Sequence, residues 1–282
     1  MSKTGTSTYA ATRWANRESY VTPCCVFILL ATALIGPAIV PYDPLLSNVS
    51  QALHPPSWQH WAGTDQIGRD VFARLLVATQ LDLLIVLSAV FLSLLIGAIT
   101  GALVGYYGGW ADKLVGRAVD ILMSFPLFIL AMLLVAAVGS GVSNIIYATA
   151  IINLPFYIRV TRSEINSRKS SGWVEAARLS GNGHGRIILN FLMPSILPIL
   201  AVQVSLNLGW ALLNAAALSF LGLGIQPPTP EWGIMIAEGA QYITSSDWWL
   251  VVCPGAMLMF VVLTFNAMGD RLRNLFDPRQ RQ

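Results

Sequence analysis

The sequence predicts an all-α, polytopic membrane protein with six transmembrane helices, and three observations lead to this fold class. Charged residues make up 11% of the 282 residues and hydrophobic residues 55%, whereas about 25% of a typical soluble domain is charged. The mean hydropathy is +0.62. The apolar residues lie in long blocks, most of which reach the roughly 20 residues that a helix needs to cross about 30 Å of hydrocarbon. This composition excludes a soluble globule and a disordered chain.

Six apolar blocks are predicted as transmembrane helices, in chain order. Their approximate bounds are 24–40, 81–104, 119–138, 143–160, 196–221 and 248–268. The first block follows Lys3, Arg13 and Arg17, as the apolar part of a signal peptide would. Its apolar run continues into Pro41 without a suitable cleavage site, so we expect a retained anchor helix. The fourth block is the shortest, and it carries Pro155 near its end.

Basic residues set the predicted orientation. Fifteen of the 17 Lys and Arg residues fall in segments on one side of the six spans, and only Arg69 and Arg74 fall on the other. Because positive charge marks cytoplasmic loops, both termini are predicted to be cytoplasmic. The chain then divides into an N-terminal segment with its anchor (1–45), an extracytoplasmic segment (46–80), a five-helix core (81–270) and a cytoplasmic tail (271–282). The core contains a long cytoplasmic loop (161–195).

Several kinds of chemistry are excluded by missing motifs. A phosphate-binding loop needs a lysine directly after a glycine, and none of the three lysines follows one. The zinc-protease and serine-hydrolase motifs are also missing, so we expect no catalytic residue. His54 and His60 are predicted to lie on the opposite side of the membrane from His184, so we expect no metal site. No basic face with interleaved aromatic residues suggests a nucleic-acid partner.

A glycine recurs at every fourth position of the second predicted span. These residues are Gly97, Gly101 and Gly105. In lipid, helices associate through close backbone packing, which small residues permit. We therefore interpret the three glycines as a helix-packing face.

The fifth predicted span carries polar side chains, Gln203, Asn207 and Asn214. A seven-residue step places the two asparagines on one face of a helix. Two interpretations stay open: these residues line a translocation path, or they form hydrogen bonds between helices.

The loop 161–195 is the most unusual cytoplasmic feature, because it concentrates basic residues. It is either a solvated loop near lipid headgroups or a docking surface for a cytoplasmic partner. Its spacing resembles the E-A-A-x3-G-x9-I-x-L-P signature of binding-protein-dependent ABC importer permeases. The matching positions are Glu175, Ala176, Ala177, Gly181, and Phe191 through Pro194, with Phe191 and Met193 in place of Ile and Leu.

Three further blocks resemble the dipeptide/oligopeptide/nickel subfamily, and in particular the second of its two permease subunits. They are the G-T-D-x-x-G-R-D block in 63–72, the end of the fifth span with the following loop in 218–233, and the G-D-R-L-R block with Asp277 and Pro278. One departure is the stretch 78–82. There the family more often has a basic residue near position 80, and serine where this chain has Asp82.

The resemblance implies a type I ABC importer permease in the bacterial inner membrane. It implies four protein partners: a homologous permease subunit, two cytoplasmic ATPase subunits and an extracytoplasmic binding protein. ATP and Mg would be bound by the ATPases, so this chain would need no cofactor. Glu175, Ala176, Ala177, Gly181 and Pro194 would belong to the loop that couples the chain to the ATPases.

The substrate implied is a di- or oligopeptide, with nickel or another small solute as the alternative. An ion-coupled secondary transporter is a remote alternative. It would require paired intramembrane carboxylates or corresponding broken helices, and the sequence predicts neither.

Overall fold

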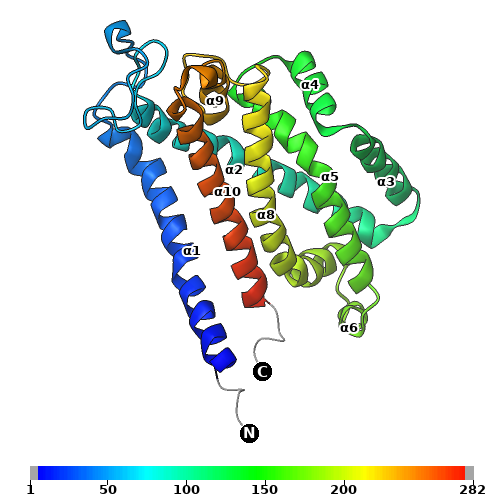
Figure 1. Ribbon diagram of the computed structural model, residues 1–282. Coiled ribbons are helices and arrows are strands. Elements are labelled where there is room, and N and C mark those ends of the chain that lie inside the picture. Colours follow the sequence, from blue (N-terminus) through cyan, green and yellow to red (C-terminus); the bar gives the residue numbers. More distant parts are fainter. Residues whose placement is uncertain (1–5, 277–282) are drawn as a thin grey trace.

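The structure is a computed structural model that describes residues 6–276, with the side chains of residues 6–19 and 138 left aside. Within these residues every regular element is helical, and a single β-bridge pairs Thr64 with Asp70 (Figure 1). Several sequence features fall outside the described residues: Lys3, Asp277, Pro278 and the rest of the predicted tail beyond residue 276.

The helices follow one another along the chain, and the longest connection between them is the segment 52–70. In order they are α1 (Thr6–Ile39), η1 (Val49–Gln51), α2 (Val71–Tyr107), α3 (Gly109–Ser124), α4 (Leu127–Val138), α5 (Val142–Arg168), α6 (Gly172–Leu179), α7 (His184–Ile187), η2 (Ile188–Leu192), α8 (Met193–Phe220), α9 (Trp232–Ala240), η3 (Ile243–Ser245) and α10 (Trp249–Phe276).

The predicted count of six spans is not reproduced. Four helical stretches among the described residues are long and apolar enough to cross a membrane: Tyr20–Ile39, Val71–Tyr107, His184–Phe220 and Trp249–Phe276. A fifth exists only if α3 and α4, which meet at a bend of 99°, are counted together. The bend lies at Phe125 and Pro126, where proline disfavours helix in the preceding residue. The helix α5 has the length of a span, but Asn153 and Arg159 make it more polar.

The second predicted span lies inside α2, which begins ten residues earlier than the sequence indicated. The Asp70 side chain accepts a hydrogen bond from the backbone N–H of Ala73 and so caps the first turn. At 37 residues, α2 is about 55 Å long, longer than the hydrocarbon core is thick. It ends at Gly108, where φ is +68°.

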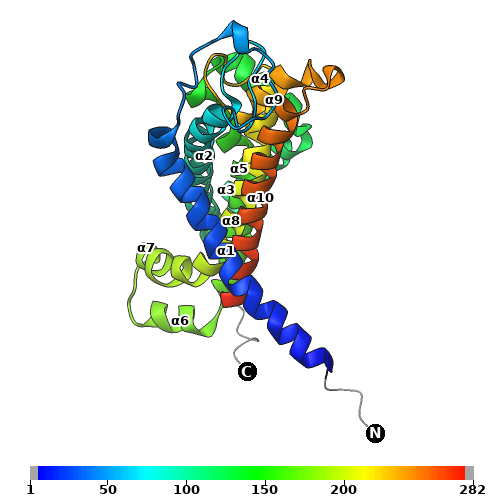
Figure 2. The ribbon, with the colours of Figure 1, turned by 60° about the vertical axis from the view of Figure 1, so that its left-hand side comes forward.

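The bundle has two distinct ends. The helices α2 and α5 pack along each other, as do α8 and α10, and α1 runs beside α2 and α10. One end, which we call the basic end, holds α6, α7, the start of α1 and the end of α10 (Figures 1 and 2). The opposite end holds the segment 40–70 and α9 (Figure 1). The main hydrophobic core joins six helices and includes Leu29, Val86, Tyr157, Leu212, Trp232 and Val261.

Candidate functional site

The helix α6 projects from the basic end of the bundle and carries the E-A-A residues (Figure 2). Val174 and Ala177, three residues apart, point inward and are buried, since such a spacing places both on one face of a helix. Val174 packs in a cluster with Ile165, Ile187 and Leu192. The helix is therefore fastened to the bundle by one apolar face.

The other face of α6 is open. Glu175 and Ala176 are exposed, and so are Trp173 at 43% and Leu179 at 86% of their surface. The Glu175 side chain forms no hydrogen bond or ion pair within the described chain. A small helix that exposes one carboxylate, one alanine and two large apolar side chains is suited to contact another protein.

The turn after α6 depends on Gly181. Its φ is +80°, a conformation that favours glycine, and no atom lies within 4 Å of where a Cβ would stand. The backbone N–H of Gly181 donates to the carbonyl of Arg178, and the Asn182 side chain donates to the carbonyl of Ala177 at 2.9 Å. These bonds satisfy carbonyl groups at the end of the helix.

After this turn the chain re-enters the bundle through α7, the π-helical turn η2 and α8. The π turn ends at Leu192, two residues before Pro194 in the first turn of α8, and π turns recur at functional sites. Pro194 lies on an apolar groove of about 700 Å³ formed by the middle of α2, the first half of α8 and the end of α10.

Two contacts that the sequence did not predict tie this region to the end of α2. The Tyr106 hydroxyl lies 2.8 Å from His184 Nδ1. The Lys169 ammonium donates to the carbonyl groups of Gly105 and Tyr106 at 3.0 and 3.4 Å, where the negative end of the α2 dipole favours a cation. No sequence pattern links residues so far apart along the chain.

The three glycines of α2 all face α5. A Cβ on Gly97 would lie 2.5 Å from Tyr157 Cβ, and one on Gly105 would lie 2.7 Å from the carbonyl oxygen of Arg162. Gly101 makes the same kind of approach one turn away. The contact is therefore within the chain, between the two helices that pack most extensively.

The polar residues of α8 are placed inside the bundle. Asn207 and Asn214 are 5% and 7% exposed, and Gln203 is half-buried. Gln203 donates to Asn207 at 3.4 Å along the same helix. The Asn207 amide nitrogen and the Tyr157 hydroxyl are buried without a hydrogen-bond partner of ordinary geometry. Such buried groups are places where a water molecule can bind.

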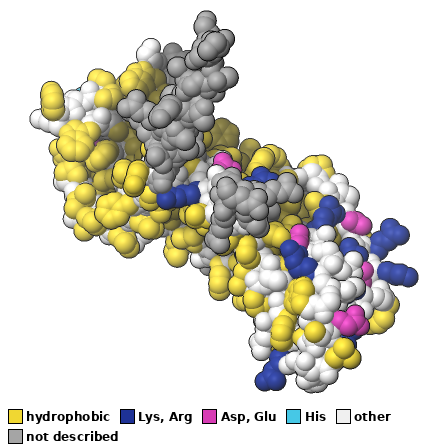
Figure 3. Space-filling view, turned by 90° about the horizontal axis from the view of Figure 1, so that it is seen from below, with side chains coloured by type: hydrophobic (Ala, Val, Ile, Leu, Met, Phe, Trp, Pro, Cys, Tyr) yellow, Lys and Arg dark blue, Asp and Glu magenta, His cyan; other side chains and the backbone are white. Residues whose placement is uncertain are grey.

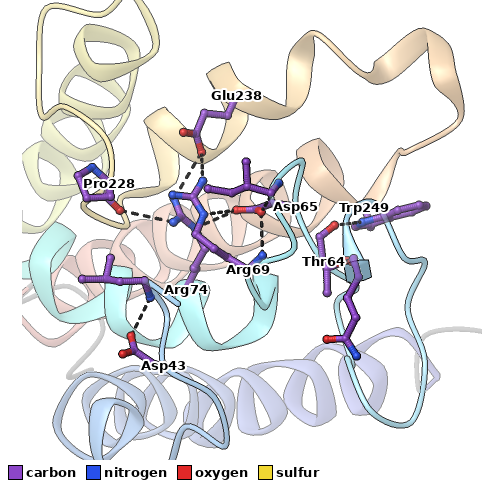
Figure 4. A network of polar contacts seen from close by, with 11 residues as sticks. Asp43, Thr64, Asp65, Arg69, Arg74, Pro228, Glu238 and Trp249 are labelled. Atoms are coloured by element: carbon purple, nitrogen blue, oxygen red, sulfur yellow. Dashed lines mark hydrogen bonds and ion pairs between the residues drawn. The ribbon is translucent and has the colours of Figure 1, made fainter. Parts of the chain in front are cut away.

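A buried ionic cluster occupies the opposite end (Figure 4). Arg69 pairs with Asp65 at 2.5 Å and with Glu238 of α9 at 3.1 Å. Arg74 of α2 approaches Glu238 at 3.4 Å and Asp65 at 3.8 Å, and also donates to the carbonyl of Pro228. Two cations and two carboxylates thus balance in charge. The cluster fastens the segment before α2 to α9, and it contains the only two basic residues predicted for this side.

The surface seen from the basic end is uneven. Lys, Arg and acidic side chains gather on the side where α5 and α6 lie, while hydrophobic side chains cover much of the remainder (Figure 3). Among the residues that the structure describes, no group of three or more His, Cys, Asp or Glu side chains could hold a metal ion.

Comparison with known proteins gives the family. Residues 74–282 match the family described as binding-protein-dependent transport system inner membrane component. The chain belongs to this family. One solved permease relative, the MetNI methionine ABC transporter in inward-facing conformations, aligns with a TM-score of 0.60 over 72% of this chain and 97% of that one. At 21% identity, that likeness concerns the fold.

Permeases named for peptide and nickel transport are similar to this chain over most of its length. The dipeptide permease DppC of Alkalihalophilus pseudofirmus is 41% identical over 90% of this chain and 83% of its own length. The di/tripeptide permease DppC of Pseudomonas aeruginosa is 40% identical over 90% and 86%. The nickel permease NikC of Escherichia coli is 37% identical over 96% of both chains.

Proposed function

We propose that this chain is the membrane-spanning permease subunit of an ATP-driven importer for di- and oligopeptides. The observation that carries the proposal is its 41% and 40% identity to permeases named for dipeptide and di/tripeptide transport, each over 90% of the chain. A probable D,D-dipeptide permease of Escherichia coli is 38% identical. The half-buried Gln203 of α8 offers an amide group that can bind a peptide backbone along a path.

Nickel import is the second candidate, because the nickel permease of Escherichia coli is 37% identical over 96% of the chain. Nickel would be the cargo here. The described residues offer it no cluster of ligands, and His60 already contacts Asp70 at 2.7 Å. This favours peptides, whose recognition needs hydrogen bonds more than metal ligands.

The same proposal assigns partners and an orientation. The exposed face of α6 would dock on an ATPase subunit, with Glu175, Ala176 and Ala177 at the contact and Gly181 shaping the turn behind it. A homologous permease would complete the path, two ATPases would bind ATP and Mg, and an extracytoplasmic binding protein would deliver the solute. The basic end would face the cytoplasm.

Transport itself is tested on the complex that copurifies with the tagged chain, reconstituted in vesicles with its binding protein. We expect ATP-dependent uptake of a labelled dipeptide that excess unlabelled tripeptide inhibits and that nickel leaves unchanged. Uptake of labelled nickel in place of the dipeptide would reject the peptide assignment. The purified chain alone should hydrolyse no more ATP than a mock preparation.

Orientation is tested separately. A reporter that is active only outside the cytoplasm is fused after Gln282 or inserted after Ser246, in the loop before α10. We expect activity from the second position and none from the first. The reverse pattern would place the basic end outside the cell.

A further inference from the structure

Two buried carboxyl groups meet where α9 begins. Asp82 and Glu231 are 3% and 1% exposed. Asp82 Oδ2 accepts the backbone N–H of Trp232 at 3.2 Å, and Glu231 accepts those of Gly233 and Ile234 at 2.9 and 2.8 Å. Because the two carboxyl groups accept from three consecutive backbone N–H groups, they lie side by side at the first turn of α9. The sequence predicted no such pair, because Asp82 lies 149 residues before Glu231.

The surroundings supply little positive charge to this pair. Neither carboxyl group forms an ion pair with a basic side chain among the described residues. The residues next to the pair in the chain, Leu83 and Trp232, are buried in the main hydrophobic core, and Ile85 and Ile234 are buried in a second apolar cluster. The start of a helix offers roughly half a positive charge, which is less than two ionised carboxylates require.

The elements packed around the pair contain few other titratable groups. The helix α8 has none, and the part of α5 before Arg159 has only Tyr147 and Tyr157. On α2 the nearest charge is Arg74, two turns away, and on α9 it is Glu238. These two already neutralise each other in the ionic cluster.

A second polar group is aimed at the same place. The Ser219 hydroxyl of α8 is buried, with 3% of the residue exposed, and it makes no hydrogen bond of ordinary geometry. It nevertheless lies close enough to act on Glu231. Burial raises the pKa of the Glu231 carboxyl group, although the N–H groups of Gly233 and Ile234, the Ser219 hydroxyl and the Asp82 carboxyl lower it.

Two adjacent carboxyl groups can hydrogen-bond each other only if one of them carries a proton. Two like charges in contact and out of water cannot both persist without a compensating cation. We propose that Asp82 and Glu231 form a buried site that holds one proton at neutral pH, and that this proton fastens α9 to α2. Loss of the proton would set two carboxylates against each other and loosen α9.

The first test is infrared spectroscopy of the complex that copurifies with the full chain. A protonated carboxyl group absorbs apart from carboxylate and amide groups. We expect this band at pH 7 in the unaltered protein and its loss in Asp82→Asn, because the asparagine amide replaces the shared proton with an N–H donor. Asp270→Asn, at an exposed position of α10, is the control that should retain the band.

The second test is thermal unfolding as a function of pH. The folded state keeps a proton that the unfolded chain has released at neutral pH. Stability therefore falls as the pH rises, until the folded state loses the proton as well. We expect this fall in the unaltered protein and a flatter profile in Asp82→Asn. If Asp82→Asn does not fold, Glu231→Gln replaces it in the unfolding experiment. The infrared band at pH 7 is then measured on the unaltered protein alone.

Three results would overturn the proposal. The band could be missing at pH 7 in the unaltered protein, or it could persist in a folded Asp82→Asn or Glu231→Gln variant. Sodium or calcium could also stabilise the unaltered protein at high pH, with no band present. That last result would mean that the two carboxyl groups bind a metal cation in place of a proton.

Discussion

Gly101 of α2 and Ile158 of α5 approach so closely that a Cβ on Gly101 would lie 2.7 Å from the carbonyl oxygen of Ile158. The atom met is backbone, so the neighbour cannot move aside as a flexible side chain could. The same Cβ would also lie 2.8 Å from Thr161 Cβ. At this point the two helices pack with no room for an additional carbon atom.

Replacing Gly101 by alanine should therefore destabilise the chain. Overpacking typically costs about 1–3 kcal/mol, more than the roughly 1 kcal/mol that alanine gains over glycine as a helix former. Gly101→Leu should prevent assembly. The matched control is Gly255→Ala in α10, where nothing lies within 4 Å of the new Cβ. Thermal unfolding in detergent is the measurement. A Gly101→Ala variant as stable as Gly255→Ala would show that α2 and α5 pack differently.

The ionic cluster at the opposite end allows a second prediction. Removing Glu238 would leave Arg69 and Arg74, both buried, with Asp65 as their only carboxylate partner. Breaking a buried ion pair from one side typically costs about 3–5 kcal/mol, so Glu238→Ala should lower the unfolding temperature strongly. Gln241→Ala, at an exposed position just after α9, should change it little. Equal unfolding temperatures for the two variants would mean that the cluster contributes no stability.

The segment around α6 could be predicted from the sequence, whereas the start of α2 could not. The E-A-A spacing marked the segment that forms α6 and the turn at Gly181, because helix periodicity and the conformation of Gly181 are local properties. The start of α2 was placed ten residues late, because Arg69, Asp70 and Arg74 read as loop residues. Arg69 and Arg74 are buried beside Glu238, which lies far along the chain, so no local pattern predicts their burial.

The third predicted span shows a different limit. Its apolar residues continue across Phe125 and Pro126, so hydropathy alone suggested one helix. The chain bends there by 99°, because proline interrupts the hydrogen bonds that continue a helix. No pattern in the sequence predicts the contact of Tyr106 with His184, because the two residues meet only where α7 folds back onto α2.

That contact is the basis of a third prediction. Tyr106→Phe removes the hydroxyl that contacts His184 and keeps the ring, whose centroid lies 5.6 Å from that of His184. A lost hydrogen bond typically costs about 0.5–1.5 kcal/mol. We expect a correspondingly small loss of stability, and faster hydrogen exchange in α7. Tyr107→Phe is the control, because Tyr107 is 61% exposed and its hydroxyl has no hydrogen-bond partner in the described chain. Identical exchange in both variants would contradict a role for the hydroxyl.

The last prediction concerns the coupling proposed for α6. Gly181 has φ at +80°, and a side chain in the left-handed region costs about 1–2 kcal/mol. Gly181→Ala should therefore distort the turn and misplace α6. Gly183→Ala is the matched control, because Gly183 has an ordinary φ of −70° and open space around its Cβ position. Both variants should insert into the membrane normally, since neither glycine lies within a hydrophobic core cluster.

Glu175→Ala tests the contact itself. The Glu175 side chain has no partner within the described chain, so its removal should leave the stability of the isolated chain unchanged. If it bonds to an ATPase subunit, the loss of a charged hydrogen bond, typically about 1.5–3 kcal/mol, should weaken copurification of that subunit and reduce peptide uptake. Gly181→Ala should do the same and Gly183→Ala should not. Full ATPase binding and full uptake in both Glu175→Ala and Gly181→Ala would mean that α6 is a solvated surface and that coupling occurs elsewhere.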